Sequence, residues 1–233
     1  MNKNPKIAIV VPAAGVGSRM QLSHPKQYLD IAGKTVLEHT LDKMLNIPAV
    51  SMIAVAVSEQ DAYFADLNID SRRIIRTPGG QERSDSVLNA LNRLVEYAPD
   101  WVLVHDAARP LVTASDITQL MTQCIHKGQG GILAAKVKDT IKRGNEYSLG
   151  TVPRDDLWQA LTPQMFPFEA LRAALESALL NNVKITDEAS AMEWNNEPVQ
   201  LIAGRSDNIK ITTPEDYALA CFLISQQQKE SAK

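Results

Sequence analysis

The sequence predicts a single α/β domain with a mostly parallel, doubly wound sheet, and three observations support this fold class. Short apolar runs alternate along the chain with amphipathic stretches, the order expected when covering helices connect parallel strands. The runs at 7–11 and 101–105 lack period-2 alternation, which favours strands buried on both faces. With 233 residues, 45% of them hydrophobic, the chain has the size and composition of one globular domain.

The individual elements can be assigned in order from the same patterns. The apolar runs expected to be strands are residues 7–11, 51–57, 74–76, 101–105, 131–137 and 199–203. The amphipathic stretches expected to be helices are residues 36–45, 84–95, 114–126, 167–180 and 214–226. The last helix has the clearest start, because Thr213 suits an N-cap and Pro214 suits the first helical position. These assignments predict a Rossmann-like domain without an internal linker.

One region departs from the alternating pattern. Residues 138–164 are polar, contain Gly144, Gly150 and Pro153, and show no clear helical periodicity. Irregular stretches of this length are uncommon in compact domains, where they are usually functional or form an arm. We therefore expect an extended arm at 138–164, inserted in a single domain that spans residues 1–233.

Composition and charge exclude several classes of protein. A net charge of −3 without a basic stretch argues against a protein that binds nucleic acid or an anionic membrane. No run reaches the roughly 18 apolar residues that a membrane span requires, and the first residues do not resemble a signal peptide. The two cysteines lack the spacing of metal ligands and indicate a reducing compartment. These features predict a cytoplasmic protein.

A glycine-containing loop, "VVPAAGVGSRM", follows the first predicted strand. It offers backbone N–H groups without bulky side chains, so phosphates can approach closely. A dinucleotide fingerprint would have a third glycine or alanine where Met20 stands, and here Arg19 and Lys26 follow the loop instead. Two such cations suit a reaction at phosphorus, where charge on phosphate oxygens must be stabilised. Taken alone, the loop is as readily a structural turn, and the cations are ordinary surface residues.

A second motif, "VHDAARP", ends the strand expected at 101–105. Ligands bind beyond the carboxyl ends of the strands in open α/β sheets, so Asp106 would lie beside the glycine-containing loop. A carboxylate in that position suits Mg²⁺, which typically takes one or two carboxylates together with substrate phosphates. The alternative for Asp106 is a helix or turn cap, and we expect His105 to support the site rather than to catalyse.

Seven motifs together resemble those of the 2-C-methyl-D-erythritol 4-phosphate cytidylyltransferases. They are "PAAGVGSRM", "PKQY", "GGQERSDSV", "VHDAARP", "ALTPQ", "TDEAS" and "DNIKIT", which occur in the family's order from about residue 7 to residue 220. The first is shared with a wider superfamily of sugar nucleotidyltransferases, whereas "VHDAARP" and "TDEAS" are more specific. The resemblance implies an enzyme that transfers CMP from CTP to 2-C-methyl-D-erythritol 4-phosphate, releasing pyrophosphate, in non-mevalonate isoprenoid biosynthesis.

The resemblance also implies a role for particular residues. The positions implied to surround the reacting phosphates are Arg19, Lys26 and Lys210. The positions implied to bind the nucleotide are Pro12, Ala13, Ala14, Gly15, Gly80, Gln81, Ser86, Asp106 and Ala107, with Asp106 also the Mg²⁺ ligand. The positions implied to hold methylerythritol phosphate are Arg109, Thr140, Arg154, Thr162 and Thr186. The arm is implied to reach a second subunit of a homodimer, so that Thr140 and Arg154 act across the interface. Gln81 stands where family members often have an acid.

Several alternatives remain open from the sequence. A ribitol-phosphate cytidylyltransferase carries close variants of the same motifs, and a catalytically silent nucleotide-binding regulator would keep the fold. Arg19, Lys26 and Asp106 count against the silent regulator, because a binder has no need of cations at the α-phosphate. From composition alone, the segment after Thr186 would be a helix start, and Lys210 would be an edge-strand lysine that prevents aggregation.

Overall fold

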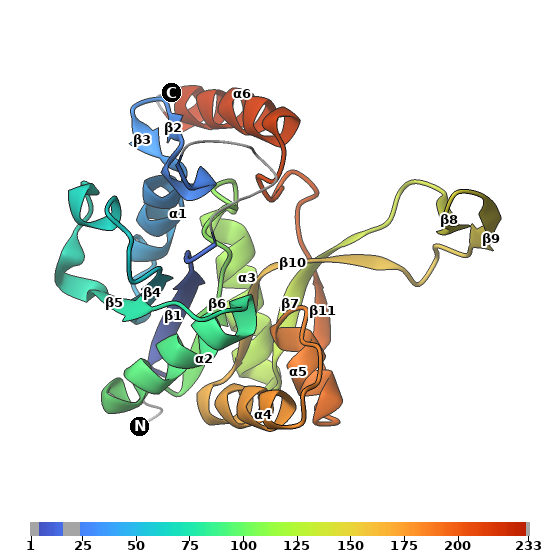
Figure 1. Ribbon diagram of the computed structural model, residues 1–233, viewed down its shortest axis with the longest axis horizontal. Helices are drawn as coiled ribbons and strands as arrows, with labels where there is room; N and C mark the ends of the chain where they lie inside the picture. Colours follow the sequence, from blue (N-terminus) through green and yellow to red (C-terminus); the bar gives the residue numbers. More distant parts are fainter. Residues whose placement is uncertain (1–4, 16–23, 232–233) are drawn as a thin grey trace.

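The computed structural model describes residues 5–15 and 24–231, and its centre is a seven-stranded sheet (Figure 1). The strand order is β11-β7-β10-β6-β1-β4-β5. The strands are β1 (Ile7–Pro12), β4 (Val50–Val57), β5 (Ile74–Pro78), β6 (Trp101–Val104), β7 (Gly131–Lys136), β10 (Trp158–Pro167) and β11 (Gln200–Ala203). All neighbouring pairs are parallel except the two that β10 makes. The mostly parallel α/β sheet expected from the sequence is thus confirmed.

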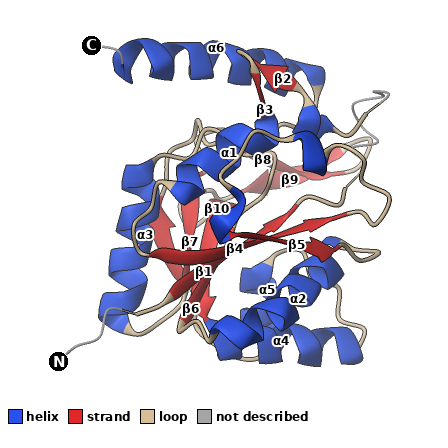
Figure 2. Ribbon diagram, turned by 90° about the vertical axis from the view of Figure 1, so that its left-hand side faces the viewer, coloured by secondary structure: helices blue, strands red, loops and turns tan. Residues whose placement is uncertain are grey.

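Helices cover both faces of this sheet (Figure 2). One apolar core joins the sheet to α1 (Val36–Leu45) and α3 (Ala114–Lys127), and a second joins it to α2 (Arg83–Leu94), α4 (Phe168–Leu180) and α5 (Glu188–Trp194). The side chains of β1 alternate between the two, since Ile9 belongs to the first core and Val10 to the second. Burial on both faces explains why this strand is apolar throughout.

The C-terminal helix α6 (Pro214–Ser231) packs apart from these two layers (Figure 1). Its Ala220 and Ile224 join a third apolar cluster with Val36 at the start of α1 and with Leu111. The short hairpin of β2 (Asp30–Ile31) and β3 (Lys34–Thr35) adds Ile31 to the same cluster. In the part of the chain that the structure describes, no helix is long and apolar enough to cross a membrane.

The arm is shorter than the sequence predicted. Residues 138–157 project from the body and carry a two-stranded hairpin of β8 (Ile141–Gly144) and β9 (Ser148–Val152) (Figure 1). Residues 158–164 instead belong to β10, which lies inside the main sheet and runs antiparallel to both β6 and β7. The sequence misled because β10 buries polar groups. Gln164, for example, is only 1% exposed. Its polar amide is tolerated there because it donates to Asp187 Oδ2 (2.8 Å) and accepts from the Ala189 N–H (2.9 Å).

Candidate functional site

A cavity of about 510 Å³ opens at the carboxyl ends of β1 and β6. This is where open α/β sheets bind ligands, because successive loops diverge there. Its walls come from segments far apart in the chain. The lining residues are Pro12, Ala13, Ala14, Gly15, Lys26, Gln27, Gly80, Gln81, Glu82, Arg83, Ser86, Asp106, Ala107, Ala108, Lys210 and Thr212. All nine residues expected to bind nucleotide line this one cavity, together with Lys26 and Lys210.

The loop after β1 presents small groups to the cavity and is fixed from below. The Ala13 N–H donates to the Ala56 carbonyl (2.7 Å), which extends the parallel ladder with β4 beyond the strand end. Ala14 packs so closely on Gly79 that a Cβ at Gly79 would lie 2.3 Å from the Ala14 Cβ. At Gly15 a Cβ would meet nothing within 4 Å, so the loop faces open space there. Residues 16–23, including Arg19, lie outside the described residues.

Lys26 begins a short 3₁₀ turn, η2 (Lys26–Tyr28), whose other two residues are buried. Gln27 donates its amide N–H to the Ala13 carbonyl (2.6 Å), and the Tyr28 hydroxyl donates to Asp61 Oδ2 (2.8 Å). Lys26 Nζ donates to the Ile211 carbonyl (2.7 Å). Because Ile211 follows Lys210, this bond ties the Lys26 side chain to the backbone segment that carries Lys210, the other lysine expected to be catalytic. No role was expected for Gln27 from the sequence, although it stands inside the "PKQY" motif.

Asp106 lies at the bottom of the cavity among three cationic side chains. Its Oδ1 is 3.0 Å from Arg83 Nε, and its Oδ2 is 2.9 Å from Lys210 Nζ and 3.5 Å from Arg109 Nε. Burial alone would raise the pKa of Asp106, but the charges of Arg83 and Lys210 outweigh burial and hold this pKa well below its usual range. Asp106 is therefore ionised at neutral pH and remains an anionic ligand for cations.

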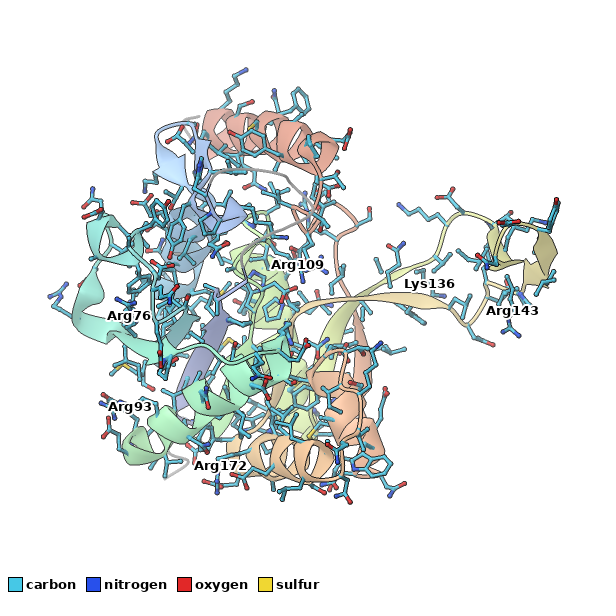
Figure 3. All side chains as sticks on the ribbon, in the orientation of Figure 1. Arg76, Arg93, Arg109, Lys136, Arg143 and Arg172 are labelled. Atoms are coloured by element: carbon cyan, nitrogen blue, oxygen red, sulfur yellow. The ribbon has the colours of Figure 1, made fainter. Side chains whose placement is uncertain are left out.

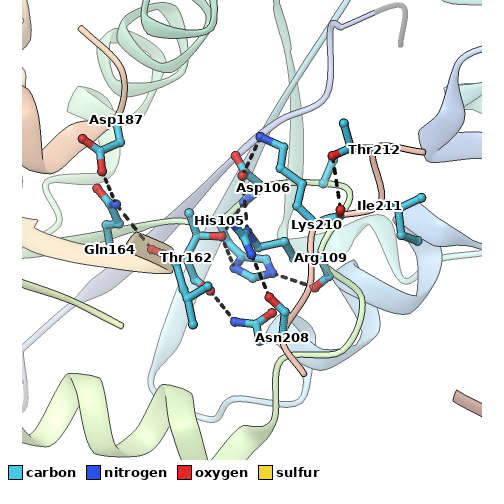
Figure 4. A network of polar contacts seen from close by, with 12 residues as sticks. His105, Asp106, Arg109, Thr162, Gln164, Asp187, Asn208, Lys210, Ile211 and Thr212 are labelled. Carbon is cyan, nitrogen blue, oxygen red and sulfur yellow. Dashed lines mark hydrogen bonds and ion pairs between the residues drawn. The ribbon is translucent and has the colours of Figure 1, made fainter. Parts of the chain in front are cut away.

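His105 supports this arrangement from behind, as the sequence suggested (Figure 4). Its side chain is fully buried, with Nε2 3.0 Å from the Arg109 carbonyl and Nδ1 3.0 Å from Thr162 Oγ1. Burial lowers the pKa of His105 to about 4, so the ring is neutral at physiological pH. The same Thr162 hydroxyl accepts from the Asp106 N–H (3.1 Å) and so links His105 to the backbone of Asp106.

The residues expected to hold methylerythritol phosphate fall into two groups. Arg109 and Thr162 lie beside Asp106, where Arg109 also donates to the Asn208 carbonyl (2.7 Å) (Figure 4). None of these five residues lines the cavity of this chain itself. Thr140 and Arg154 are exposed near the base of the arm, where Arg154 donates to the Lys138 carbonyl. A single chain thus brings together only part of the expected substrate site.

Arg83 and Glu188 also belong to the cluster around Asp106, and no role was expected for either from the sequence, although they stand inside the motifs "GGQERSDSV" and "TDEAS". Arg83 lines the cavity, and both terminal nitrogens of its guanidinium contact Glu188, at 2.6 and 3.1 Å. The one local signal was that Arg83 stands at the start of a predicted helix, where a positive side chain is unfavourable beside the positive end of the helix dipole. Such a residue needs a nearby anion, but the sequence does not say which one.

Comparison with known proteins gives a consistent result. The family model of 2-C-methyl-D-erythritol 4-phosphate cytidylyltransferase matches residues 7–226. A relative of that name from Pseudoalteromonas translucida is 61% identical over 232 residues, which cover 100% of this chain and 96% of the relative. Another from Vibrio cholerae is 54% identical over 226 residues, covering 95% and 97%. The crystal structure of the Francisella tularensis enzyme has a TM-score of 0.82 at 36% identity, with 94% and 99% coverage.

Proposed function

The chain belongs to the 2-C-methyl-D-erythritol 4-phosphate cytidylyltransferase family, and we propose that the cavity beyond β1 and β6 is its active site. The activity is transfer of CMP from CTP to 2-C-methyl-D-erythritol 4-phosphate, in the non-mevalonate pathway. One observation carries the assignment to this cavity. The small-residue loop, Lys26, Asp106 and Lys210 line the same space, although they come from distant parts of the chain.

CTP binding is assigned to two adjoining segments of the cavity wall, which meet where Ala14 packs on Gly79. Residues 12–15 offer backbone N–H groups without bulky side chains, which suits the phosphates and the ribose. The second segment contains Gly80 and Ser86, which are fixed to each other by a hydrogen bond from the Gly80 N–H to Ser86 Oγ (2.9 Å). A rigid wall of this kind suits recognition of a base, because little ordering cost remains when the base binds.

The proposed chemistry is an in-line displacement at the α-phosphorus. A phosphate oxygen of methylerythritol phosphate forms the new P–O bond, the bond to the β-phosphate breaks, and pyrophosphate leaves. The attacking oxygen is already anionic, so the step needs neither a general base nor a covalent intermediate with the protein. Lys26, Lys210 and Arg19 are assigned to counter the charge that grows on the phosphate oxygens, so the protein contributes positioning and electrostatic stabilisation.

Mg²⁺ is assigned to Asp106 together with phosphate oxygens of the nucleotide. The donor chemistry fits, because an ionised carboxylate faces the cavity and Mg²⁺ commonly binds through one or two carboxylates plus substrate phosphates. Among the described residues, no group of three or more His, Cys, Asp or Glu side chains could hold a metal by itself. When bound, the ion would neutralise part of the phosphate charge.

We also propose that the chain acts as a cytoplasmic homodimer in which the arms are exchanged. The arm displays two large apolar side chains to solvent, Tyr147 (81% exposed) and Leu149 (80% exposed), and an isolated chain buries neither. Figure 3 shows Arg143 on the arm, well away from Arg109, and Lys136 at the end of β7 between them. A partner's cavity would gain Thr140 and Arg154 from such an exchange. Sedimentation as a fully active monomer at micromolar concentration would refute it.

A substrate panel tests the proposed function. Pyrophosphate release should be measured with CTP, UTP, ATP and GTP against methylerythritol phosphate, and then with ribitol and glycerol phosphates. We expect turnover with CTP and methylerythritol phosphate far above every other pair. Preference for ribitol phosphate would favour the related polyol-phosphate enzymes. Nucleotide binding without pyrophosphate release would favour the silent regulator.

A further inference from the structure

Glu188 is a buried carboxylate that lies next to the site but does not line the cavity. It is the first residue of α5, and its side chain is 1% exposed. Both of its oxygens contact Arg83, with Oε1 2.6 Å from one terminal nitrogen and Oε2 3.1 Å from the other. This is a bidentate pair, the arrangement that a guanidinium and a carboxylate form most favourably.

Arg83 therefore meets Asp106 with its third nitrogen only. The Nε–H donates to Asp106 Oδ1 at 3.0 Å, while Oδ2 lies 2.9 Å from Lys210 Nζ. The two oxygens of Asp106 are thus shared between different cations. This division depends on where the terminal nitrogens of Arg83 point, and those nitrogens point at Glu188.

We propose that Glu188 is a positioning residue, which holds the terminal nitrogens of Arg83 so that Oδ2 of Asp106 stays available to Lys210. Without the charge on Glu188, the remaining carboxylate contact of Arg83 among the described residues is Asp106. A bidentate pair between Arg83 and Asp106 would occupy both Asp106 oxygens and displace Lys210 from its place in the cavity. The inference rests on the catalytic role proposed above for Lys210.

Capping and stability do not account for this arrangement. The N-terminus of α5 already has a cap, since Asp187 Oδ1 accepts from the Ser190 N–H (3.0 Å) and the Ser190 hydroxyl completes the capping box. A buried ion pair is also a weak source of stability, because apolar residues of similar volume are often as good or better in its place. The orientation of Arg83 is what Glu188 supplies and what an apolar residue would not.

Glu188→Gln tests the proposal, because it removes the charge and keeps the shape. We expect kcat to fall by about 10- to 100-fold, the loss typical when a partner that orients a site ligand is removed. The KM for CTP should stay within about threefold. Glu169→Gln is the matched control, since it removes a carboxylate 2.9 Å from Arg172 on the surface of α4, and it should leave kcat unchanged.

A second background separates positioning from a purely structural role. In Arg83→Lys no fork exists to be oriented, so adding Glu188→Gln should change kcat by no more than about twofold. An equal loss in both backgrounds would overturn the proposal, as would normal kcat in Glu188→Gln. Chemical unfolding of each variant identifies any loss of folded protein, and kcat is compared per folded molecule.

A crystal structure of Glu188→Gln gives a readout independent of activity. We expect the terminal nitrogens of the Arg83 guanidinium to have turned to Asp106, and an unmoved Arg83 would overturn the inference. Lys210→Met separates this result from failure of the proposed function. If Lys210→Met retains full activity, the assignment of Lys210 is wrong. If Lys210→Met is inactive while Arg83 stays in place in Glu188→Gln, only the positioning role is wrong.

Discussion

Replacing Lys26 with alanine removes a half-buried ammonium group from the wall of the cavity. Its Nζ is fixed by a 2.7 Å bond to the Ile211 carbonyl, so the charge is positioned before substrate binds. Two unit charges about 4 Å apart interact by roughly 4 kcal/mol at an effective dielectric constant near 20. If between half and all of a unit charge develops on the phosphate oxygen it faces, the variant loses about 2–4 kcal/mol of transition-state stabilisation.

Since about 1.4 kcal/mol corresponds to a tenfold change in rate, we expect kcat to fall by roughly 30- to 1,000-fold in Lys26→Ala. Pyrophosphate release at saturating substrates measures kcat, and calorimetry measures the dissociation constant of CTP, which should weaken by only about threefold to tenfold. The two effects differ because the charge that Lys26 neutralises grows mainly in the transition state.

Lys34→Ala is the control for this experiment, because Lys34 is 52% exposed and pairs with Asp42 outside the cavity. The loss of the bond to Ile211 could lower stability by about 1 kcal/mol, which urea unfolding would detect separately. A kcat within threefold of the parent protein, in a folded Lys26→Ala variant, would refute the placement of the reacting phosphates beside Lys26.

Gln27, His105 and the arm each offer a measurable test of the same geometry. Gln27→Glu replaces the amide that donates a hydrogen bond to the Ala13 carbonyl with a carboxylate that can only accept. The loop should then be less well fixed, and CTP affinity measured by calorimetry should fall by about tenfold. Unchanged affinity would contradict a role for this bond. The folded-state pKa of His105 is about 4, below its unfolded value of about 6.5, so its contribution to stability is fully present above pH 6.5 and is lost as the pH falls towards 4. Lowering the pH from 7 to 4.5 should therefore reduce the free energy of unfolding, measured with urea, by about 2–3 kcal/mol more in the parent than in His105→Gln. An equal pH dependence of the free energy of unfolding in the two proteins would reject this. Mixing Arg154→Ala with Lys26→Ala subunits should restore up to about a quarter of parental activity if Arg154 serves the partner's site, and no restoration would count against the exchanged arm.

Features that depend on neighbouring residues were predictable from the sequence. The helix at 36–45 was placed at its observed bounds, and the last helix was placed at its observed start. There Thr213 and Asp216 bond each other's groups reciprocally, with the Thr213 N–H donating to Asp216 Oδ2 (2.8 Å) and the Asp216 N–H donating to Thr213 Oγ1 (3.3 Å). Caps and apolar periodicity act within one or two turns, so they can be recognised without knowing the fold. The prediction ended this helix at Gln226, but it continues to Ser231.

The loop after β1 and Asp106 could also be placed at one cavity from the sequence, because both follow predicted parallel strands and the carboxyl ends of such strands meet at one edge. Other features depend on contacts between distant segments, and only the tertiary structure decided them. β10 lies inside the sheet because it pairs with β6 and β7, and its buried Gln164 is tolerated because Asp187 and Ala189 supply hydrogen-bond partners. Glu188, 105 positions from Arg83 along the chain, reaches it only when α2 and α5 pack on the same face of the sheet. The sequence gives the position of each charged residue along the chain. Which counter-ion that residue contacts depends on how whole helices and strands pack, and this packing is determined by the surface that the entire domain buries.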